Sequence, residues 1–240
     1  DMGKKIRKAF KPSENHVFLD ADYSQIELRL LAHFSGDSTL TNAFFEGADI
    51  HYETAKKIFS AEFANQKRAI AKSINFGLIY GMGAKKLSET LQISLTDAKN
   101  YIQSYFDSFP TVKTYLKNAE EEILRNGYAA TLLGHKRHFS FGDIPDHTKA
   151  AYLREGINTI FQGSAADLIK LAMLEIYRQN YQARDLRMLL QIHDELIFEI
   201  REDSINLLAQ KLMHTMEHIY SLHVPLVCGM SKGKNWGELK

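Results

Sequence analysis

Two aspartates stand where predicted strands end or turn, and a carboxylate at such a position can do chemistry. Asp22 follows the segment HVFLDA, and Asp194 lies at the tip of a predicted hairpin over residues 187–200. If the two converge, like charges about 4 Å apart repel by roughly 4 kcal/mol at an effective dielectric of about 20, so a cation should lie between them. Carboxylate and carbonyl oxygens suit Mg²⁺, which takes further ligands from water and substrate phosphates. Two such ions about 3.5–4 Å apart favour in-line phosphoryl transfer.

The same residues also have a purely structural interpretation. Asp22 fits a turn or capping residue, and the run His193-Asp194-Glu195 fits the polar tip of a hairpin. Glu27 stands three residues after Ser24, the spacing of a helix capping box. Spacing alone leaves both interpretations open.

A second group of residues lies at strict four-residue intervals in RAIAKSINFGLIYG. Arg68, Lys72, Phe76 and Tyr80 advance by about 40° each on a helix and form one stripe. A guanidinium fork and an ammonium one turn apart suit a triphosphate, and the two rings offer faces for stacking a base. Gly81 permits a close backbone approach at the helix end. An amphipathic helix with buried rings and solvated cations fits the spacing equally well.

A third run, Arg154, Asn158 and Gln162, again has four-residue spacing. Its donors and amides can hydrogen-bond base edges or sugar from one helix face. Ordinary surface polarity is the alternative.

The elements that must position these residues can be read from periodicity. A strand that begins at residue 16 gives way to a helix near Asp22, with helical periodicity from Ser24. A strand pair over 187–200 precedes a helix that begins at Ser204. Helices are predicted over 50–59, 66–80, 96–109, 111–126 and 150–180, with a hairpin around Gly134 and a break near Gln162, after which Ser164 offers a second N-cap. This order predicts an α+β domain interrupted by a helical insertion.

The composition bounds the class of protein. With 240 residues, 45% hydrophobic and 25% charged, the chain is an ordinary globular sequence. Its single cysteine, Cys228, excludes a disulfide within the chain and a cysteine-cluster metal site, so we expect a reducing cytoplasm. We expect no secretory signal and no membrane span, because no apolar run approaches roughly 18 residues. The net charge of +1 hides basic blocks at 4–11, 63–88 and 135–154, which a polyanion could contact.

Three motifs in order carry a family resemblance. DYSQIELR at 22–29, RAIAKSINFGLIYG at 68–81 and HDE at 193–195 resemble motifs A, B and C of family A DNA polymerases, the bacterial DNA polymerase I type. AHFSGD at 32–37, GADIH at 47–51 and QGSAADLIKLAM at 162–173 extend the likeness over nearly the whole chain.

The resemblance implies a right-hand polymerase fold of the α+β class. A small antiparallel palm sheet would come from residues 1–40 and 151–240, with a largely helical fingers subdomain inserted at 41–150. The family's thumb and exonuclease-type domain would lie upstream, so the chain resembles a C-terminal fragment of palm and fingers.

The resemblance also implies catalytic roles. Asp22 and Asp194 would hold two Mg²⁺ ions, for which Mn²⁺ can substitute, and the Tyr23 carbonyl would be a further ligand. Glu195 would lie near the primer terminus. Asp20, on the same predicted strand face as Asp22, has no family role.

Two binding sets follow from the same motifs. The implied nucleotide-binding residues are Arg68, Lys72, Phe76, Tyr80, Glu27 and Gln25. Lys72 would donate a proton to pyrophosphate, and Glu27 would block the 2′-hydroxyl of a ribonucleotide. The implied DNA-binding residues are Arg154, Asn158, Gln162, His193 and Gly81.

The expected function is DNA-directed DNA synthesis in replication and repair, with primer-template DNA and deoxynucleoside triphosphates as partners. We expect a monomer that works on the nucleoid. One alternative is a fragment that binds nucleotide and primer-template without efficient turnover. Another is a single-subunit RNA polymerase, against which Glu27, Glu195 and the NFG of 75–77 argue.

Overall fold

The computed structural model describes residues 2–179 and 185–239. Within that part the chain forms two compact units, which are described separately. The sheet unit comprises Asp1–Ile26, Ala165–Ser221 and Leu226–Lys240, and the helical unit comprises Glu27–Ser164 and Leu222–Pro225. The expected palm and fingers bounds, 1–40, 41–150 and 151–240, stay a prediction, because the units are defined by their internal contacts and not by subdomain.

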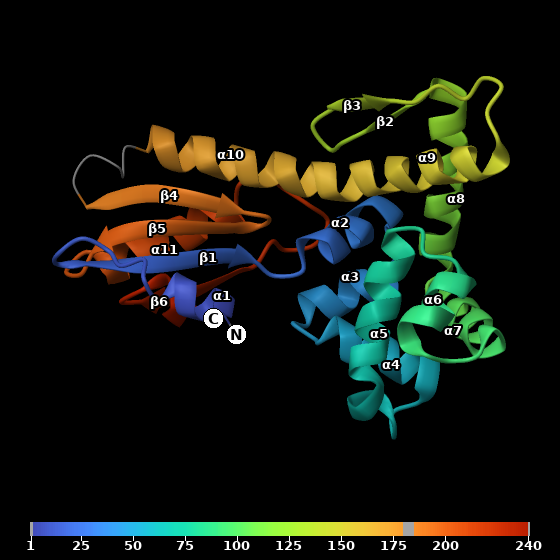
Figure 1. Cartoon of the computed structure of the whole chain (residues 1–240), viewed down its shortest axis with the longest axis horizontal. Helices are drawn as coiled ribbons and strands as arrows, with labels where there is room; N and C mark the ends of the chain where they lie inside the picture. The colour runs from blue at the N-terminus through green and yellow to red at the C-terminus, as the bar shows by residue number, and fades with distance from the viewer. Residues whose placement is uncertain (1, 180–184, 240) are drawn as a thin grey trace. The chain divides into compact units, whose positions relative to one another are not determined.

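The sheet unit is built on an antiparallel sheet in the order β4-β5-β1-β6 among the described residues (Figure 1). Its strands are β1 (His16–Tyr23), β4 (Leu186–Ile192), β5 (Glu195–Arg201) and β6 (Cys228–Gly233). The central strand β1, which lies between β5 and β6, is buried along most of its length, more completely than a simple alternation predicts. The expected small antiparallel sheet is confirmed.

Helices complete the sheet unit. Helix α11 (Ile205–Glu217) packs against β1, β5 and β6 through an apolar side that includes the buried Leu212 and Met216. Near its end the Tyr23 hydroxyl donates to the Met216 carbonyl at 2.8 Å, which fixes the end of β1 on α11. Helix α1 (Met2–Arg7) contacts the short helix η2 (Trp236–Glu238), and α10 (Ser164–Arg178) leads toward β4.

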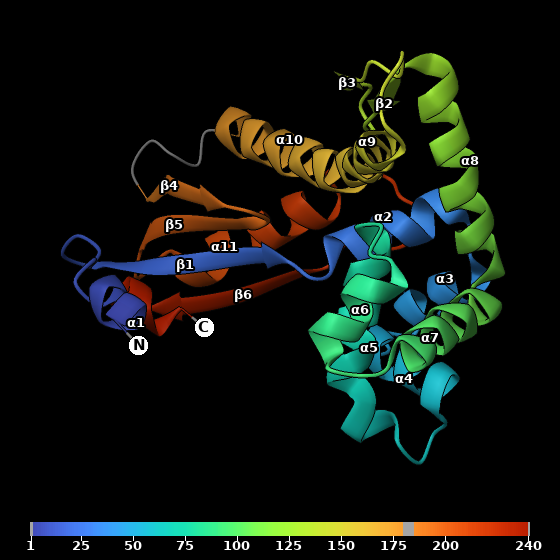
Figure 2. The same cartoon turned by 45° about the vertical axis from the view of Figure 1, so that its right-hand side comes forward.

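The helical unit holds the remaining helices (Figure 2). They are α2 (Ile26–Ser35), α3 (Ser38–Phe45), α4 (Ile50–Phe59), α5 (Ala64–Ile79), α6 (Ala84–Leu91), α7 (Leu95–Ser108), α8 (Pro110–Asn126) and α9 (Asp146–Asn158). The expected hairpin is β2 (Tyr128–Ala130) with β3 (Lys136–His138). Both views show α4 and α5 side by side. The eight-residue α3 and α6 were not predicted, because so few residues give little periodicity.

Two boundaries differ from the prediction. Helix α8 begins at Pro110, one residue before the predicted 111–126, since a proline at the first helical position loses no hydrogen bond. The break near Gln162 is instead a π-helical turn, η1 (Thr159–Gly163), that continues into α10. Ser164 therefore has helical backbone angles, φ −67° and ψ −37°, and is not an N-cap. Its hydroxyl donates back to the Ile160 carbonyl and accepts from the Leu132 N–H at 2.8 Å.

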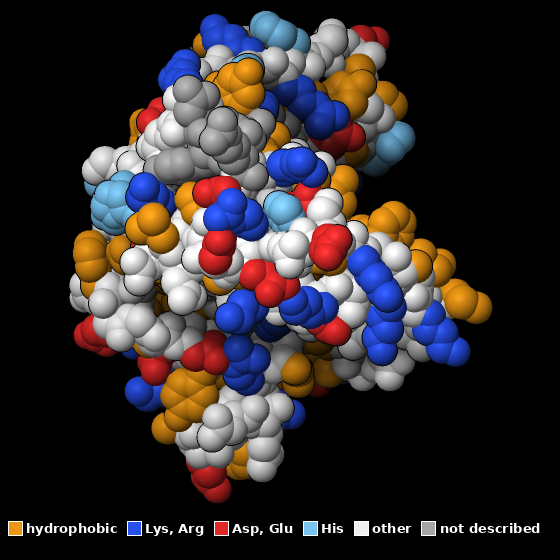
Figure 3. Space-filling model, turned by 90° about the vertical axis from the view of Figure 1, so that its left-hand side faces the viewer, with side chains coloured by type: hydrophobic (Ala, Val, Ile, Leu, Met, Phe, Trp, Pro, Cys, Tyr) orange, Lys and Arg blue, Asp and Glu red, His pale blue; other side chains and the backbone are white. Residues whose placement is uncertain are grey.

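No helix among the described residues has the length and hydrophobicity needed to cross a membrane. On the face drawn in Figure 3, lysine and arginine side chains are interleaved with aspartate and glutamate side chains.

Candidate active site

The acidic residues of the first and third motifs meet at one end of the sheet. The register pairs Asp22 of β1 directly with Glu195 of β5, and the Tyr23 N–H donates to the Asp194 carbonyl at 3.2 Å. We call Asp22, Asp194 and Glu195 the acidic edge. All three side chains are half-buried, so solvent or a ligand can reach them. The predicted hairpin is therefore confirmed, with His193 and Asp194 as its two-residue turn.

Two residues beside the acidic edge have an unusual backbone. His193 and Gln25 have φ of 55° and 54°, in the left-handed region that non-glycine residues seldom adopt. A two-residue hairpin turn requires a positive φ, which explains His193. Such residues cost of order 1–3 kcal/mol and cluster at active sites and ligand clamps. The sequence contains no glycine at either position, so the turns are built from polar residues that can also contact a ligand.

The surroundings of the acidic edge are electronegative. Burial raises the pKa of the Cys228 thiol to about 12, and the nearby charges of Glu217, Asp22 and Asp20 raise it further. Burial likewise raises the pKa of Tyr23 well above its usual value, with smaller contributions from Cys228 and Glu217. Asp20 is only 1% exposed and accepts from the Ser231 hydroxyl at 3.3 Å, which places it in the core of the sheet unit.

The donor chemistry of the acidic edge fits a hard divalent cation. The described residues contain no group of three or more His, Cys, Asp or Glu arranged to hold a metal by themselves. Carboxylates and the Tyr23 carbonyl are oxygen ligands, and Mg²⁺ is commonly held by one or two carboxylates together with water and substrate phosphates. A shared site of this kind needs fewer protein ligands than a structural metal cage.

Helix α5 presents the predicted stripe. Arg68 and Lys72 are exposed, whereas Phe76 and Tyr80 are half-buried with their ring centroids 6.4 Å apart and nearly parallel at 22°. Neither ring is in the core, so the interpretation of Phe76 and Tyr80 as purely internal packing does not describe them. Aromatic faces that remain accessible beside two cations can receive a nucleobase and its phosphates.

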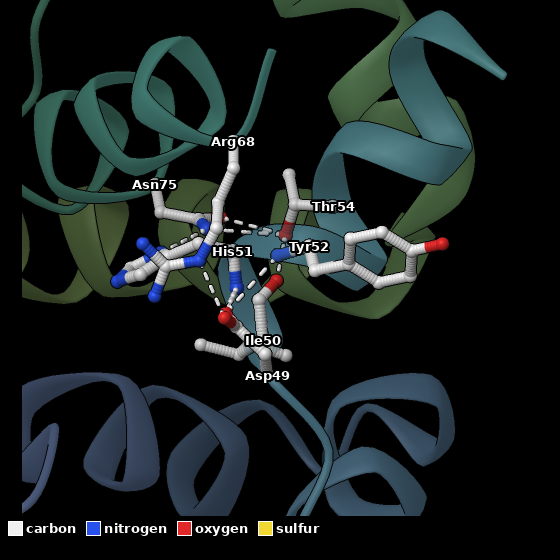
Figure 4. A network of polar contacts seen from close by, with 7 residues as sticks. All are labelled: Asp49, Ile50, His51, Tyr52, Thr54, Arg68 and Asn75. Carbon is white, nitrogen blue, oxygen red and sulfur yellow. Dashed lines mark hydrogen bonds and ion pairs between the residues drawn. The ribbon is translucent and has the colours of Figure 1, made fainter. Parts of the chain in front are cut away.

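The N-terminus of α4 contacts this stripe (Figure 4). Asp49 is the N-cap of α4, and its Oδ1 accepts from the N–H groups of His51 at 3.0 Å and Tyr52 at 3.1 Å. Its Oδ2 accepts from Arg68 Nε at 2.5 Å. One carboxylate thus caps the N-terminus of α4 and also binds a cation of the neighbouring helix α5.

A buried polar network continues from α4 into α5. Asn75 Nδ2 donates to His51 Nδ1 at 3.0 Å, and Thr54 Oγ1 donates to the Ile50 carbonyl at 2.7 Å and lies 3.2 Å from Asn75 Oδ1. Because an amide nitrogen only donates, Nδ1 of His51 accepts and the ring proton sits on Nε2. The His51 ring also lies 5.6 Å from the Phe76 ring, centroid to centroid.

Burial lowers the pKa of His51 to about 4. The Asp49 charge opposes this shift, while the Arg68 and Lys72 charges add to it. His51 is therefore neutral at pH 7, consistent with Nδ1 accepting from Asn75. Sequence reasoning assigned no role to Asp49, His51 or Asn75. The available signals were an aspartate directly before a predicted helix and an asparagine in the middle of one.

The end of α5 is tied to two other predicted residues. The Tyr80 hydroxyl donates to Glu27, which brings a residue of the first motif to the end of the second. Gly81 has φ of 67°, and a Cβ on it would lie 2.7 Å from Cγ of Arg154. Only glycine fits this close approach without displacing Arg154. The structure thus groups Tyr80, Gly81, Glu27 and Arg154 within the helical unit.

The third run lies across the π-helical turn. Arg154 and Gln162 are exposed and Asn158 is half-buried. In an α-helix, which has 3.6 residues per turn, side chains four residues apart shift around the axis in one direction. In the wider π-helical turn the same spacing shifts them in the opposite direction. This keeps the three side chains close to one face. Asn158 Oδ1 is buried and has no hydrogen-bond partner among the described residues.

Comparison with known proteins identifies the family. The sequence profile described as DNA polymerase family A matches residues 1–238. The chain belongs to DNA polymerase family A. It is 52% identical over 240 residues to DNA polymerase I of Helicobacter pylori (strain J99), covering 99% of this chain and 27% of that protein. It is 41% identical over 244 residues to DNA polymerase I of Borreliella burgdorferi, covering 100% of this chain and 27% of that protein.

A solved structure of the same family shares the fold. The polymerase domain of Pol1 from M. smegmatis, in complex with a DNA primer-template and dNTP, matches with a TM-score of 0.92 and 36% identity. The match covers 100% of this chain and 43% of that one. The expected α+β polymerase fold is confirmed, and the chain spans about 27% of the length of the curated family A relatives named above. Family A DNA polymerases generally use divalent metal ions.

Proposed function

We propose that the natural protein containing this chain carries out template-directed DNA synthesis, adding deoxynucleoside triphosphates to a primer 3′ end with release of pyrophosphate. The acidic edge carries this proposal, because Asp22, Asp194 and Glu195 meet at one end of the sheet in a family A fold. The M. smegmatis relative, in complex with primer-template and dNTP, supports the proposed substrates.

The acidic edge is the proposed metal site. Asp22, Asp194 and the Tyr23 carbonyl would hold two Mg²⁺ ions, with Mn²⁺ as a substitute. When bound, the ions neutralise the charge that develops on the transferred phosphoryl group and stabilise the attacking and leaving oxygens. The chain's own contribution is to hold the carboxylate and carbonyl oxygens of the acidic edge at the end of paired strands, where the Tyr23 hydroxyl is bonded to α11. Glu195 and His193 would lie near the primer terminus.

The face of α5 is the proposed nucleotide site. Arg68 and Lys72 would bind the triphosphate, and Phe76 and Tyr80 would lie against the base and sugar. The primer 3′-oxygen attacks the α-phosphorus in line, and the bond to pyrophosphate breaks. Lys72 can donate a proton to the leaving pyrophosphate, because its ammonium is a compact donor on a flexible stem. Positioning and charge stabilisation supply most of the rate, since the phosphoryl group needs little covalent help from the protein.

The remaining predicted residues have proposed roles in selection and DNA binding. Glu27, held by the Tyr80 hydroxyl, would crowd the 2′ position of the sugar, with Gln25 close to it in the chain. Primer-template DNA would be contacted by Arg154, Asn158, Gln162, His193 and Gly81. We propose that the protein acts as a monomer on nucleoid DNA in the cytoplasm.

Single-nucleotide incorporation on a primer-template with Mg²⁺ at low salt tests the proposal. We expect Asp194→Ala to lower incorporation by at least about a hundredfold, because it removes a ligand of the metal ions that would stabilise the reacting phosphate. The control is Asp203→Ala, which removes an exposed acid of the same unit whose recorded ion pair is with Arg201. If Asp194→Ala incorporated the nucleotide as strongly as the unaltered protein, the proposed site would be excluded. Nucleotide binding without any incorporation would support the binding-only alternative.

A further inference from the structure

Asp49 divides its carboxylate between two helices. Oδ1 accepts two backbone N–H groups at the first turn of α4, from His51 and Tyr52, so the orientation of the carboxylate is set by the helix itself. Oδ2 then points to Arg68 and accepts from its Nε at 2.5 Å (Figure 4). The helix cap therefore orients Oδ2 independently of Arg68.

Arg68 uses only part of its donor set in this contact. A guanidinium has five N–H donors in a planar fork, and Nε carries one of them. Within the described residues, the contact with Asp49 is the recorded polar interaction of Arg68, whose side chain is 46% exposed. A hydrogen bond at Nε leaves the outer edge, formed by the two terminal nitrogens, for a bidentate contact with phosphate.

The contact also limits how freely Arg68 can move. An arginine side chain has many rotamers, and ordering it on binding weakens affinity. A carboxylate that already holds Nε reduces the conformational entropy that Arg68 would lose on binding a ligand. Against this, a negative charge close to a triphosphate repels it. Burial acts to raise the pKa of Asp49, but the Arg68 hydrogen bond and the backbone N–H groups of α4 outweigh burial and hold that pKa below its usual value. Asp49 is therefore charged at neutral pH, and positioning and repulsion act in opposite directions.

We propose that Asp49 is a positioning residue, which anchors Arg68 through Nε so that the terminal fork of the guanidinium is presented to the triphosphate of the incoming nucleotide. This inference rests on the proposed function, because it concerns the same nucleotide site. The geometry favours positioning over competition, since the bond from Nε does not occupy the edge that a phosphate needs. Asp49 itself touches no substrate in this scheme and acts through Arg68.

The variant Asp49→Asn tests the sign of the effect. Asparagine caps a helix about as well as aspartate, so α4 should be retained while the charged anchor for Arg68 is lost. We expect the affinity for a deoxynucleoside triphosphate, and for inorganic tripolyphosphate as a second probe, to fall roughly three- to tenfold. Both are measured by displacement of a fluorescent nucleotide from the natural protein containing this chain. In primer extension, KM for the nucleotide should rise by a similar factor with a smaller change in kcat.

The matched control is Glu53→Gln. Glu53 lies in the first turn of the same helix and pairs with Lys56 at 3.6 Å, with no recorded contact to Arg68. This substitution removes one negative charge near the same site, so it should leave triphosphate affinity unchanged or slightly higher. A fall in affinity confined to Asp49→Asn separates positioning from a general effect of charge.

A double variant makes the assignment to Arg68 specific. Lysine has no Nε–H fork, so Asp49→Asn placed on Arg68→Lys should cause no further loss of affinity. The inference is overturned if Asp49→Asn binds triphosphate as tightly as the unaltered protein or more tightly, or if its penalty persists on Arg68→Lys. It also falls if the unaltered protein binds no triphosphate. Failure of the proposed function is a different result, in which triphosphate binds and responds as expected but no nucleotide is incorporated.

Discussion

At the scale of single residues, the structure joins side chains that the sequence could only suggest separately. Glu27 and Tyr80 belong to different motifs, and the Tyr80 hydroxyl donates to the Glu27 carboxylate. Gly81 follows directly and accommodates Arg154. The capping role of Glu27 that the spacing with Ser24 suggests stays a prediction. Its hydrogen bond to Tyr80 holds the carboxylate at the end of α5, where we propose that it selects the sugar.

The residue-scale prediction concerns sugar selection. We expect Glu27→Ala to raise the use of ribonucleotides relative to deoxynucleotides by about tenfold or more, because the carboxylate would no longer occupy the 2′ position; tenfold corresponds to about 1.4 kcal/mol. Tyr80→Phe, which removes only the hydroxyl that holds Glu27, should give a smaller increase. The measurement is kcat/KM for matched ribo- and deoxynucleotides on one primer-template. Unchanged selectivity in Glu27→Ala would leave the capping interpretation as the better one.

At the scale of elements, the π-helical turn η1 is held by an unusual serine. The Ser164 hydroxyl donates to the Ile160 carbonyl one turn back and accepts from the Leu132 N–H of the β2–β3 turn. We therefore expect the turn to depend on the hairpin that packs beside it. Since Asn158 and Gln162 flank or belong to η1, we expect this contact to affect how the two proposed DNA-binding residues point.

Ser164→Ala tests this dependence. The substitution leaves the Leu132 N–H without its acceptor, so we expect a loss of roughly 1–2 kcal/mol in the free energy of unfolding and weaker primer-template binding. Ser164→Thr keeps the hydroxyl and should retain most of both. Ser108→Ala is the matched control, because the Ser108 hydroxyl makes the same bond one turn back, to the Ser104 carbonyl at 2.8 Å, without a second recorded partner. Equal effects of the two alanine variants would show that the link to the hairpin is unimportant.

At the scale of the whole molecule, binding to DNA should depend on charge more strongly than the net charge of +1 suggests. On the face in Figure 3, lysine and arginine side chains lie among aspartate and glutamate side chains. The proposed DNA and nucleotide ligands Arg154, Arg68 and Lys72 are exposed, which leaves them open to screening by salt.

The whole-molecule prediction is a steep salt dependence. Contacts with phosphate release counterions, so raising monovalent salt from about 50 to 200 mM should weaken primer-template binding by at least about tenfold. Incorporation should recover at low salt and high DNA concentration. Fluorescence anisotropy of a labelled primer-template, measured beside incorporation over the same salt series, checks both. Tight DNA binding at low salt without any incorporation would favour the binding-only alternative.

Much of the architecture and of the candidate site could be predicted from local patterns. Periodicity and turn residues, which act over a few neighbours, predict three parts of the structure. These are the hairpin with His193 and Asp194 at its tip, the strand-to-helix step after Asp22, and the helices α4, α5, α7 and α8. The π-turn could not be predicted, because an α-helical turn and a π-helical turn differ by only one hydrogen-bond step. The short helices α3 and α6 carry too few residues for a clear pattern.

The sequence by itself determined the chemistry available to this protein and its family, because motif residues and their spacing are local properties of the chain. Only the tertiary structure decided which of these residues meet. Asp22 and Glu195 pair across strands far apart in sequence, and Asp49 reaches Arg68 on the neighbouring helix. The physical reason is that such contacts depend on strand register and helix packing, which are set by burial of the whole core and not by the residues that come into contact.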